Sequence, residues 1–315
     1  MRGLDAWKPT DVDSWTLAKW ASFSSLGCGG KHLEAALSLH QASSSFQQCE
    51  AALQTLITAN HILHHQKVLD AYGHVSFRHP DNPEVFVMSG DRAPALVASS
   101  ADLIEYRVVD SSPVDPNARK GYQERFIHSE IYKQFSDVNS VIHSHSEAVL
   151  PFTMSGVAMQ PAFHIAGFLG TEVPLYDITD LYQPEDQQDM LVNTPKFGAS
   201  LAATFSTSQP SGRDSHSVVL MANHGFTAVG TSIKQAVYRA VYTHINAGIQ
   251  SNAIILRNAQ LSLQSGVSET KIRYLNEKQT MGSQKMNDAS QDRPWGLWAR
   301  EVEVSPMYVN RDASR

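Results

Sequence analysis

Apolar and polar positions follow two different periods along this chain, and the period predicts the element. From Gln47 to Tyr72 apolar residues recur at helical intervals, which predicts an amphipathic helix. A second helix is expected over residues 122–135. A third, long helix is expected to start at a Thr231 or Ser232 cap and to reach Leu261. Helices are therefore predicted at both the start and the end of residues 47–261.

Shorter stretches of alternating or continuous apolar residues predict strands between these helices. They cover Val75–Phe77, Val85–Met88, Leu103–Val109, Ser140–His145, Val173–Ile178, Ser217–Met221 and Phe226–Val229, with a further helix expected over Pro151–Met159. Because helices and strands are mixed without an internal repeat, the pattern indicates one α/β domain over residues 47–265. Residues 1–46, with Trp7, Trp15 and Trp20, form an N-terminal extension. Residues 266–315 form a C-terminal tail, expected to pack near the site or on a neighbouring subunit.

Composition narrows the class of protein. The 315 residues include 25 basic and 31 acidic side chains, a net charge of −6, with 42% apolar and 18% charged residues. These fractions are typical of a globular protein, and the mildly acidic balance argues against a nucleic-acid partner. The sequence shows neither a signal peptide nor an apolar run long enough to span a membrane. We therefore expect a cytoplasmic protein with no membrane partner.

The chain has 14 histidines and only 2 cysteines. Two cysteines allow no disulfide framework and no cysteine-rich zinc site. A bound metal ion would therefore need histidine and carboxylate ligands.

Two histidines lie in the predicted strand Ser140–His145. Side chains at positions i and i+2 of a strand share a face, so His143 and His145 project together. Two imidazoles on one rigid strand can form half of a metal site. The alternative is a pair of surface histidines on an edge strand.

Two further signals lie on either side of that strand in the sequence. Glu124 and His128 are four residues apart on the preceding predicted helix, and so share one helical face. His224 lies in an Asn-His-Gly turn after a buried strand. Read alone, these signals could be a solvated helical carboxylate and an ordinary turn. Together with His143 and His145 they offer three nitrogens and one oxygen, which suits zinc and leaves iron, manganese, cobalt and nickel open.

Five motifs in order resemble the class II aldolase/adducin family over roughly residues 47–261. They are Gly73-His-Val-Ser-Phe-Arg78, Met88-Ser-Gly90, Glu124-Arg-Phe-Ile-His128-Ser-Glu-Ile-Tyr132, Val141-Ile-His-Ser-His-Ser146 and Asn223-His-Gly225. The resemblance implies a central mixed β-sheet flanked by helices in a single domain. It also implies a lyase acting on a small molecule and a homo-oligomer, usually a tetramer with sites at subunit interfaces. By the same resemblance, His143, His145 and His224 bind the metal, and Glu124 is the acid/base or a fourth ligand.

Two positions depart from the sugar-phosphate aldolases of this family. Those enzymes have a Ser-Ser pair just before the catalytic glutamate, where this chain has Gly121-Tyr-Gln123, and His74 replaces the usual asparagine. Larger rings here replace small polar groups that suit an anion. We therefore expect a non-phosphorylated, aromatic or heterocyclic substrate. The expected substrate contacts are His74, Ser89, Gly90, Tyr122, His128 and His164.

The expected reaction is cleavage of a C–C or C–N bond next to a carbonyl. Such cleavage builds negative charge, which a bound dication can stabilise as a Lewis acid. One form of it is a cyclopenase-type elimination and ring contraction giving a quinolone in specialised metabolism. The alternatives are a decarboxylase of a hydroxylated aromatic acid, a retro-aldolase on a sugar-type substrate, and, in a different class, a non-catalytic adducin-like scaffold.

Overall fold

The computed structural model of the protein describes residues 29–206, 215–263 and 271–313. The chain divides into two compact units, residues 1–48 and 49–315. The described residues of the first unit are the first part of helix α2 (Gly29–His65), and the remaining residues of this helix belong to the second unit. The three tryptophans expected in the N-terminal extension lie outside the described residues. The site described below belongs entirely to the second unit.

Helix α2 differs at both ends from the helix expected over residues 47–72. It begins earlier, at Gly29, and ends at His65, just before Lys67 adopts a left-handed φ of 60°. Val68 and Leu69 continue the apolar spacing beyond the helix because both side chains are buried in the core. The periodicity therefore marked the buried positions correctly but extended the helix too far.

All seven expected strands form, and they make one sheet in the order β3-β2-β1-β4-β7-β6-β5. Their bounds are β1 (His74–Arg78), β2 (Val85–Ser89), β3 (Leu103–Arg107), β4 (Ser140–Ser144), β5 (Leu175–Tyr176), β6 (Val218–Met221) and β7 (Gly225–Gly230). Neighbouring strands are antiparallel except β5 and β6, which are parallel. The expected mixed sheet is confirmed, with β4 at its centre. This strand carries His143 and ends at Ser144, so His145 follows its last residue and does not belong to it.

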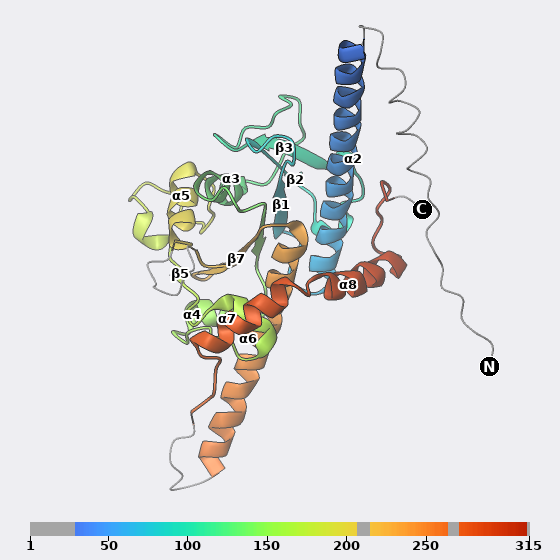
Figure 1. Ribbon diagram of the computed structural model, residues 1–315. Coiled ribbons are helices and arrows are strands. Elements are labelled where there is room, and N and C mark those ends of the chain that lie inside the picture. Colours follow the sequence, from blue (N-terminus) through green and yellow to red (C-terminus); the bar gives the residue numbers. More distant parts are fainter. Residues whose placement is uncertain (1–28, 207–214, 264–270, 314–315) are drawn as a thin grey trace, which may run out of the picture. The chain divides into compact units, whose positions relative to one another are not determined.

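Helices cover both faces of this sheet (Figure 1). Helices α3 (Arg125–Gln134) and α5 (Pro195–Thr204) pack on one face, and α2, α6 (Ile233–Leu263) and α8 (Asp292–Val304) pack on the other. Alternate β4 residues enter the two cores: Val141 joins the α3 side and Ile142 the α2 side. Burying both faces in this way stabilises the sheet and fixes the direction in which His143 projects.

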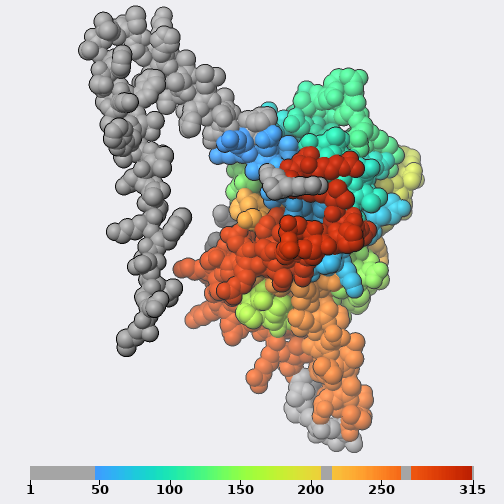
Figure 2. Space-filling view, turned by 90° about the vertical axis from the view of Figure 1, so that its right-hand side faces the viewer, coloured from blue at the N-terminus to red at the C-terminus, as the bar shows by residue number. Residues whose placement is uncertain are grey.

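The C-terminal residues pack on their own chain. Helix α7 (Glu277–Asp288) lies against the short 3₁₀ helix His164–Leu169, where Asn287 Nδ2 donates to the Ile165 carbonyl over 2.9 Å. Further along, the Tyr308 hydroxyl bonds His64 Nδ1 on α2 at 2.9 Å. Figure 2 shows this segment in red, spread between the blue α2 and the orange α6.

The remaining short elements connect the sheet and its helices. They are helix α4 (Leu150–Met154) and the 3₁₀ turns Pro94–Leu96, Ser100–Asp102 and Thr179–Leu181. Within the described ranges, no helix has both the length and the apolar character needed to cross a membrane.

Candidate metal centre

Four of the residues singled out from the sequence meet at one point in the fold. Glu124, His143, His145 and His224 each place one potential ligand atom within 4.8 Å of all the others. Glu124 and His143 are buried, and His145 and His224 are partly exposed. We call these four residues the ligand cluster. It joins the start of one helix, a central strand and the turn between two other strands.

The side-chain atoms of the ligand cluster face one another at short range. His143 Nε2 lies 3.0 Å from His145 Nε2 and 3.5 Å from Glu124 Oε2. His224 Nε2 lies 3.7 Å from Glu124 Oε1. The three imidazole rings have centroids 4.8 to 5.1 Å apart. This convergence of nitrogen and carboxylate oxygen around one point is the arrangement that a cation requires.

The turn that carries His224 explains why asparagine and glycine flank it. Asn223 has a left-handed φ of 52°, a conformation that asparagine tolerates better than most residues. Gly225 has a φ of 149°, and a Cβ there would lie 2.0 Å from the Ser144 carbonyl oxygen. Only glycine fits at that position. The tight β6–β7 connection therefore holds His224 beside the end of β4.

The sequence predicts Glu124 within the helix. In the structure it is the N-cap residue of α3, just before the regular turns begin. Its side chain turns inward, where Oε1 accepts a hydrogen bond from the Val192 N–H at 2.9 Å. Burial raises the pKa of Glu124 to about 7, and the hydrogen bond from Val192 only partly opposes this. A carboxyl group with a pKa near neutrality can both release and accept a proton at physiological pH.

Burial keeps two histidines of the ligand cluster, His143 and His224, neutral. It lowers the pKa of His143 well below its ordinary value, and the neighbouring His224 and His145 lower it further. Burial, again with the help of His145, lowers the pKa of His224 to about 4. The neutral imidazole is the form that binds a metal ion.

Asp70 is a fifth member of this region that the sequence analysis missed. Its Oδ2 atom lies 3.2 Å from His145 Nδ1, on the ring side opposite the cluster. Its Oδ1 atom accepts the N–H groups of Tyr72 and Gly73 at 2.9 and 2.8 Å. Burial alone would raise the pKa of Asp70, but the hydrogen bonds from His145 and these backbone groups hold it below its ordinary value. An ionised carboxylate behind a histidine orients that ring and makes it a better ligand.

A buried chain of hydrogen bonds lies behind the ligand cluster. His74 Nδ1 bonds His128 Nε2 at 2.7 Å, and His128 Nδ1 bonds Ser76 Oγ at 2.6 Å. Ser76 Oγ in turn lies 2.7 Å from the Tyr132 hydroxyl. The His74 ring packs on His143, with centroids 5.1 Å apart. This chain therefore fixes the ring that supports His143 from behind.

The ligand cluster opens into a cavity of about 720 Å³, within the range of small-molecule sites. Glu124, His145 and His224 lie in its wall. The wall also contains the mainly apolar side chains Ala71, Tyr72, Ala93, Tyr122, Leu150, Met190 and Leu191. Asp91, Arg92, Lys120 and Asp189 line it too, so the cavity can bring a small molecule with both an apolar ring and polar groups to the cluster.

The expected substrate contacts are distributed unevenly around this cavity. Tyr122 lines it, and its ring packs on His74 with centroids 4.7 Å apart. His74, His128 and Ser89 are all fully buried behind the wall. Gly90 forms a β-bridge with Gly121. The sixth, His164, is exposed at the start of the 3₁₀ helix under α7 and does not line this cavity.

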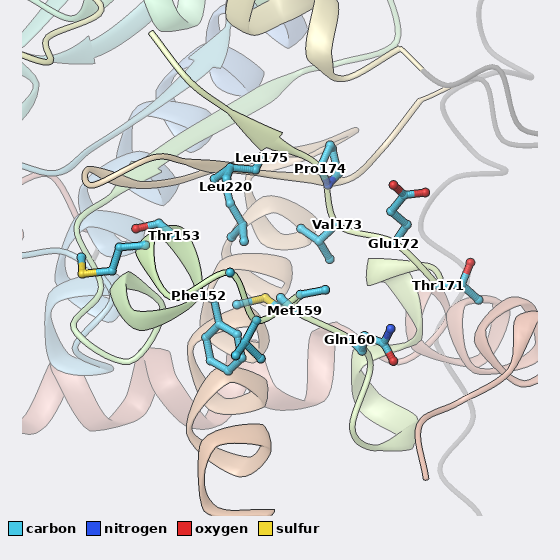
Figure 3. A pocket seen from close by; sticks show the side chains of 14 residues that line it. Phe152, Thr153, Met159, Gln160, Thr171, Glu172, Val173, Pro174, Leu175 and Leu220 are labelled. Atoms are coloured by element: carbon cyan, nitrogen blue, oxygen red, sulfur yellow. The ribbon is translucent and has the colours of Figure 1, made fainter. Parts of the chain in front are cut away.

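A second cavity of about 610 Å³ lies elsewhere (Figure 3). Phe152, Met159, Val173 and Leu220 are among its lining residues, and Glu172 is its only ionisable one. None of the expected site residues belongs to it. The ligand cluster is therefore reached from the first cavity and not from this one.

The ligand cluster fits a divalent metal ion. It offers three imidazoles and one carboxyl group, a donor set that suits zinc and other borderline ions. The buried Nδ1 of His143 has no hydrogen-bond partner in the described part of the chain, and its Nε2 faces the other members of the ligand cluster.

Comparison with known proteins agrees with this fold. The model of the class II aldolase and adducin N-terminal domain matches residues 54–251, and the chain belongs to this family. The resemblance seen in the sequence is therefore confirmed. Class II aldolases generally depend on a divalent metal ion, and the decarboxylases and aldolases among the homologues are lyases. The expectation of a lyase is confirmed at this level.

Two curated relatives are named as decarboxylases. Decarboxylase tropJ of Talaromyces stipitatus is 46% identical over 258 residues, which cover 82% of this chain and 96% of the relative. The 3,4-dihydroxyphthalate decarboxylase of Arthrobacter keyseri is 26% identical over 208 residues, covering 63% and 77%. Among solved structures, L-fuculose 1-phosphate aldolase from Glaciozyma antarctica is 18% identical with a TM-score of 0.59, covering 82% of this chain and 92% of that one. This last likeness concerns the fold alone.

Proposed function

We propose that this protein is a metal-dependent decarboxylase of a hydroxylated aromatic acid, with zinc at the ligand cluster. The proposal rests on the cavity at the ligand cluster, whose wall contains both members of the cluster and aromatic and aliphatic side chains. The relative that is 46% identical over 96% of its length is named as a decarboxylase, which supports the same reaction. No observation favours a cyclopenase-type elimination over this, although both reactions belong to the lyase class expected from the sequence.

The cavity wall also argues against a sugar phosphate. Tyr122 occupies the place where the sugar-phosphate aldolases have small serine hydroxyl groups, and its hydroxyl donates to the Arg92 carbonyl at 2.6 Å. Burial raises the pKa of Tyr122 to about 12, so this hydroxyl stays protonated. A neutral ring in the wall is suited to stacking on a flat substrate and not to holding a phosphate dianion.

In this proposal, His143, His145 and His224 hold the metal ion, and Glu124 lies beside it as the acid/base. A dication held there would supply Lewis-acid stabilisation of the negative charge that develops as the C–C bond breaks. Glu124 carries the proton in this proposal, and burial in the cavity wall favours the protonated form of its carboxyl group. When the bond to the substrate carboxylate breaks, CO₂ leaves and the electron pair remains on the ring carbon. That carbon then takes the proton from Glu124.

The other residues of the region position these groups. Asp70 orients the His145 ring, and His74 supports His143 from behind. The wall residues around Tyr122 exclude water from the ring carbon that is protonated. By family resemblance we also propose a homotetramer that acts on a small molecule of specialised metabolism.

The reaction is tested by incubating the zinc-loaded protein with hydroxylated aromatic acids and measuring released CO₂. The panel includes 3,4-dihydroxyphthalate and 2,3-dihydroxybenzoate, with L-fuculose 1-phosphate as the aldolase control. We expect stoichiometric CO₂ and a decarboxylated product from at least one aromatic acid, and no cleavage of the sugar phosphate. Cleavage of the sugar phosphate without CO₂ release from any acid would contradict the proposal.

Replacing Asp70 with Asn is expected to weaken zinc binding about 10- to 100-fold, because the His145 ring loses its carboxylate partner. Competition with a chromophoric chelator measures this affinity. At saturating zinc, turnover should return close to the wild-type value, because Asp70 does not line the cavity. An unchanged zinc affinity in this variant would remove Asp70 from the site.

A further inference from the structure

One cationic side chain of the cavity wall is anchored from behind and has no role in the chemistry described so far. Arg92 lines the same cavity as Glu124, His145 and His224. Its side chain is 43% exposed, and Nη1 donates to Asp102 Oδ1 at 2.5 Å. Within the described ranges its other guanidinium N–H groups have no hydrogen-bond partner. One edge of the guanidinium is therefore fixed while the rest is free to bind a ligand.

Asp102 is built to hold this arginine in place. Its side chain is only 6% exposed, and Oδ2 accepts the N–H groups of Ala98 and Ser99 at 2.9 and 3.2 Å. Its Oδ1 also accepts Arg119 Nη1 at 3.2 Å. A buried carboxylate with two cationic partners and two backbone donors remains ionised and rigid. Arg92 therefore needs little ordering when it binds an anion.

The backbone of Arg92 is fixed relative to the aromatic wall. The Gly90–Gly121 bridge joins the two segments, and the Asp91 N–H donates to the Lys120 carbonyl at 2.9 Å. The Tyr122 hydroxyl donates to the Arg92 carbonyl. The guanidinium and the Tyr122 ring therefore belong to one rigid rim of the cavity.

The other charged side chains of the wall are less suited to bind an anion. Lys120 is 78% exposed and pairs with Asp91 at 3.4 Å. Asp189 is itself acidic and accepts hydrogen bonds from neighbouring groups, so it offers no donor to an anion. Arginine also presents two parallel donors that match a carboxylate, which lysine does not.

We infer that Arg92 is the residue that binds the second carboxylate of an aromatic dicarboxylic acid, the substrate class that the name of the 3,4-dihydroxyphthalate decarboxylase relative already indicates. This inference rests on the proposed decarboxylation. Arg92 is assigned to the carboxylate that is retained, because pairing with the departing one would stabilise the ground state and slow its loss. The retained group, bound equally in the ground and transition states, contributes to affinity and not to the rate of the chemical step.

Binding without turnover tests this inference independently of the reaction. Phthalate and benzoate are titrated into the zinc-loaded protein by calorimetry, for the wild type, Arg92→Gln and Arg119→Gln. Arg119 is the matched control because it shares Asp102 with Arg92 but does not line this cavity. We expect phthalate to bind about 10- to 100-fold more tightly than benzoate, the effect of one charge-assisted hydrogen-bonded pair.

That preference should be lost in Arg92→Gln and kept in Arg119→Gln, with zinc content unchanged in both. A preference that survives in Arg92→Gln, or the absence of one in the wild type, overturns the inference. If the protein prefers phthalate through Arg92 but releases no CO₂ from any aromatic acid, the binding site stands and the proposed reaction fails. With a turned-over dicarboxylate, Arg92→Gln should raise KM by a similar factor and leave kcat nearly unchanged.

Discussion

Replacing Glu124 with Gln is expected to lower kcat by about 10²- to 10⁴-fold, the usual contribution of a positioned general acid. The amide cannot deliver a proton to the ring carbon. Its oxygen can still accept the Val192 N–H and lie beside the histidines, so we expect the zinc content of the variant to equal that of the wild type. Steady-state CO₂ release and metal analysis on the same preparation measure both quantities.

The control for this variant is Glu130→Gln. Glu130 is also buried on α3, pairs with Lys133 at 2.6 Å and does not line the cavity. We expect its kcat to remain close to that of the wild type. If Glu124→Gln keeps wild-type turnover, the proton is supplied by another group and the role given to Glu124 is wrong.

Replacing His143 or His224 with Ala is expected to remove the metal ion itself. Each change deletes one of the three nitrogen donors, and the two histidines that remain bind zinc far more weakly. The loss should be largest for His143, because its ring lies in the middle of the ligand cluster and is fully buried. Metal analysis after dialysis, together with lost CO₂ release, measures the effect.

His164→Ala provides the matched histidine-to-alanine control, because that side chain is exposed and lies outside the cavity. Its metal content should equal the wild-type value. Circular dichroism separates loss of metal from loss of fold in the other two variants. Full metal occupancy in folded His143→Ala or His224→Ala would refute that residue as a ligand.

Most of the sheet could be predicted from the sequence, but part of the helical layer could not. The strands alternate or are continuously apolar because both faces of the sheet are covered. Helix α5 was missed because small residues occupy much of it, and only Phe197 and Leu201 present an apolar pair at helical spacing. Gly198 allows the close approach of α3, since a Cβ there would lie 2.5 Å from the Phe126 carbonyl. Such close packing leaves no strong hydrophobic period in the sequence.

Helix α8 was missed for a different reason. Pro294 and Gly296 lie in its first turns, and both residues usually indicate a helix end or a turn. Proline is tolerated there because the first N–H groups of a helix have no partner within it. Trp298 and Val302, four residues apart, supply the buried face.

The ligand cluster could be inferred because each of its parts has a local signature. His143 and His145 share a strand face, and the Asn-His-Gly turn fixes His224. Asp70 could not be found this way, because its contact with His145 depends on the chain turning back after the end of α2. Arg92 follows the Ser89-Gly90 motif by two residues, but its anchoring by Asp102 is visible only in the folded chain.

The central claim is that the ligand cluster binds one divalent metal ion on which the chemistry depends. The metal content of the protein, purified without chelator and determined by elemental mass spectrometry, tests this most directly. The one such cluster among the described residues predicts close to one divalent transition-metal ion per chain, with zinc as the expected element. Removing it should abolish CO₂ release, and adding zinc back should restore it. Protein without stoichiometric metal, whose turnover a chelator leaves unchanged, would contradict the account.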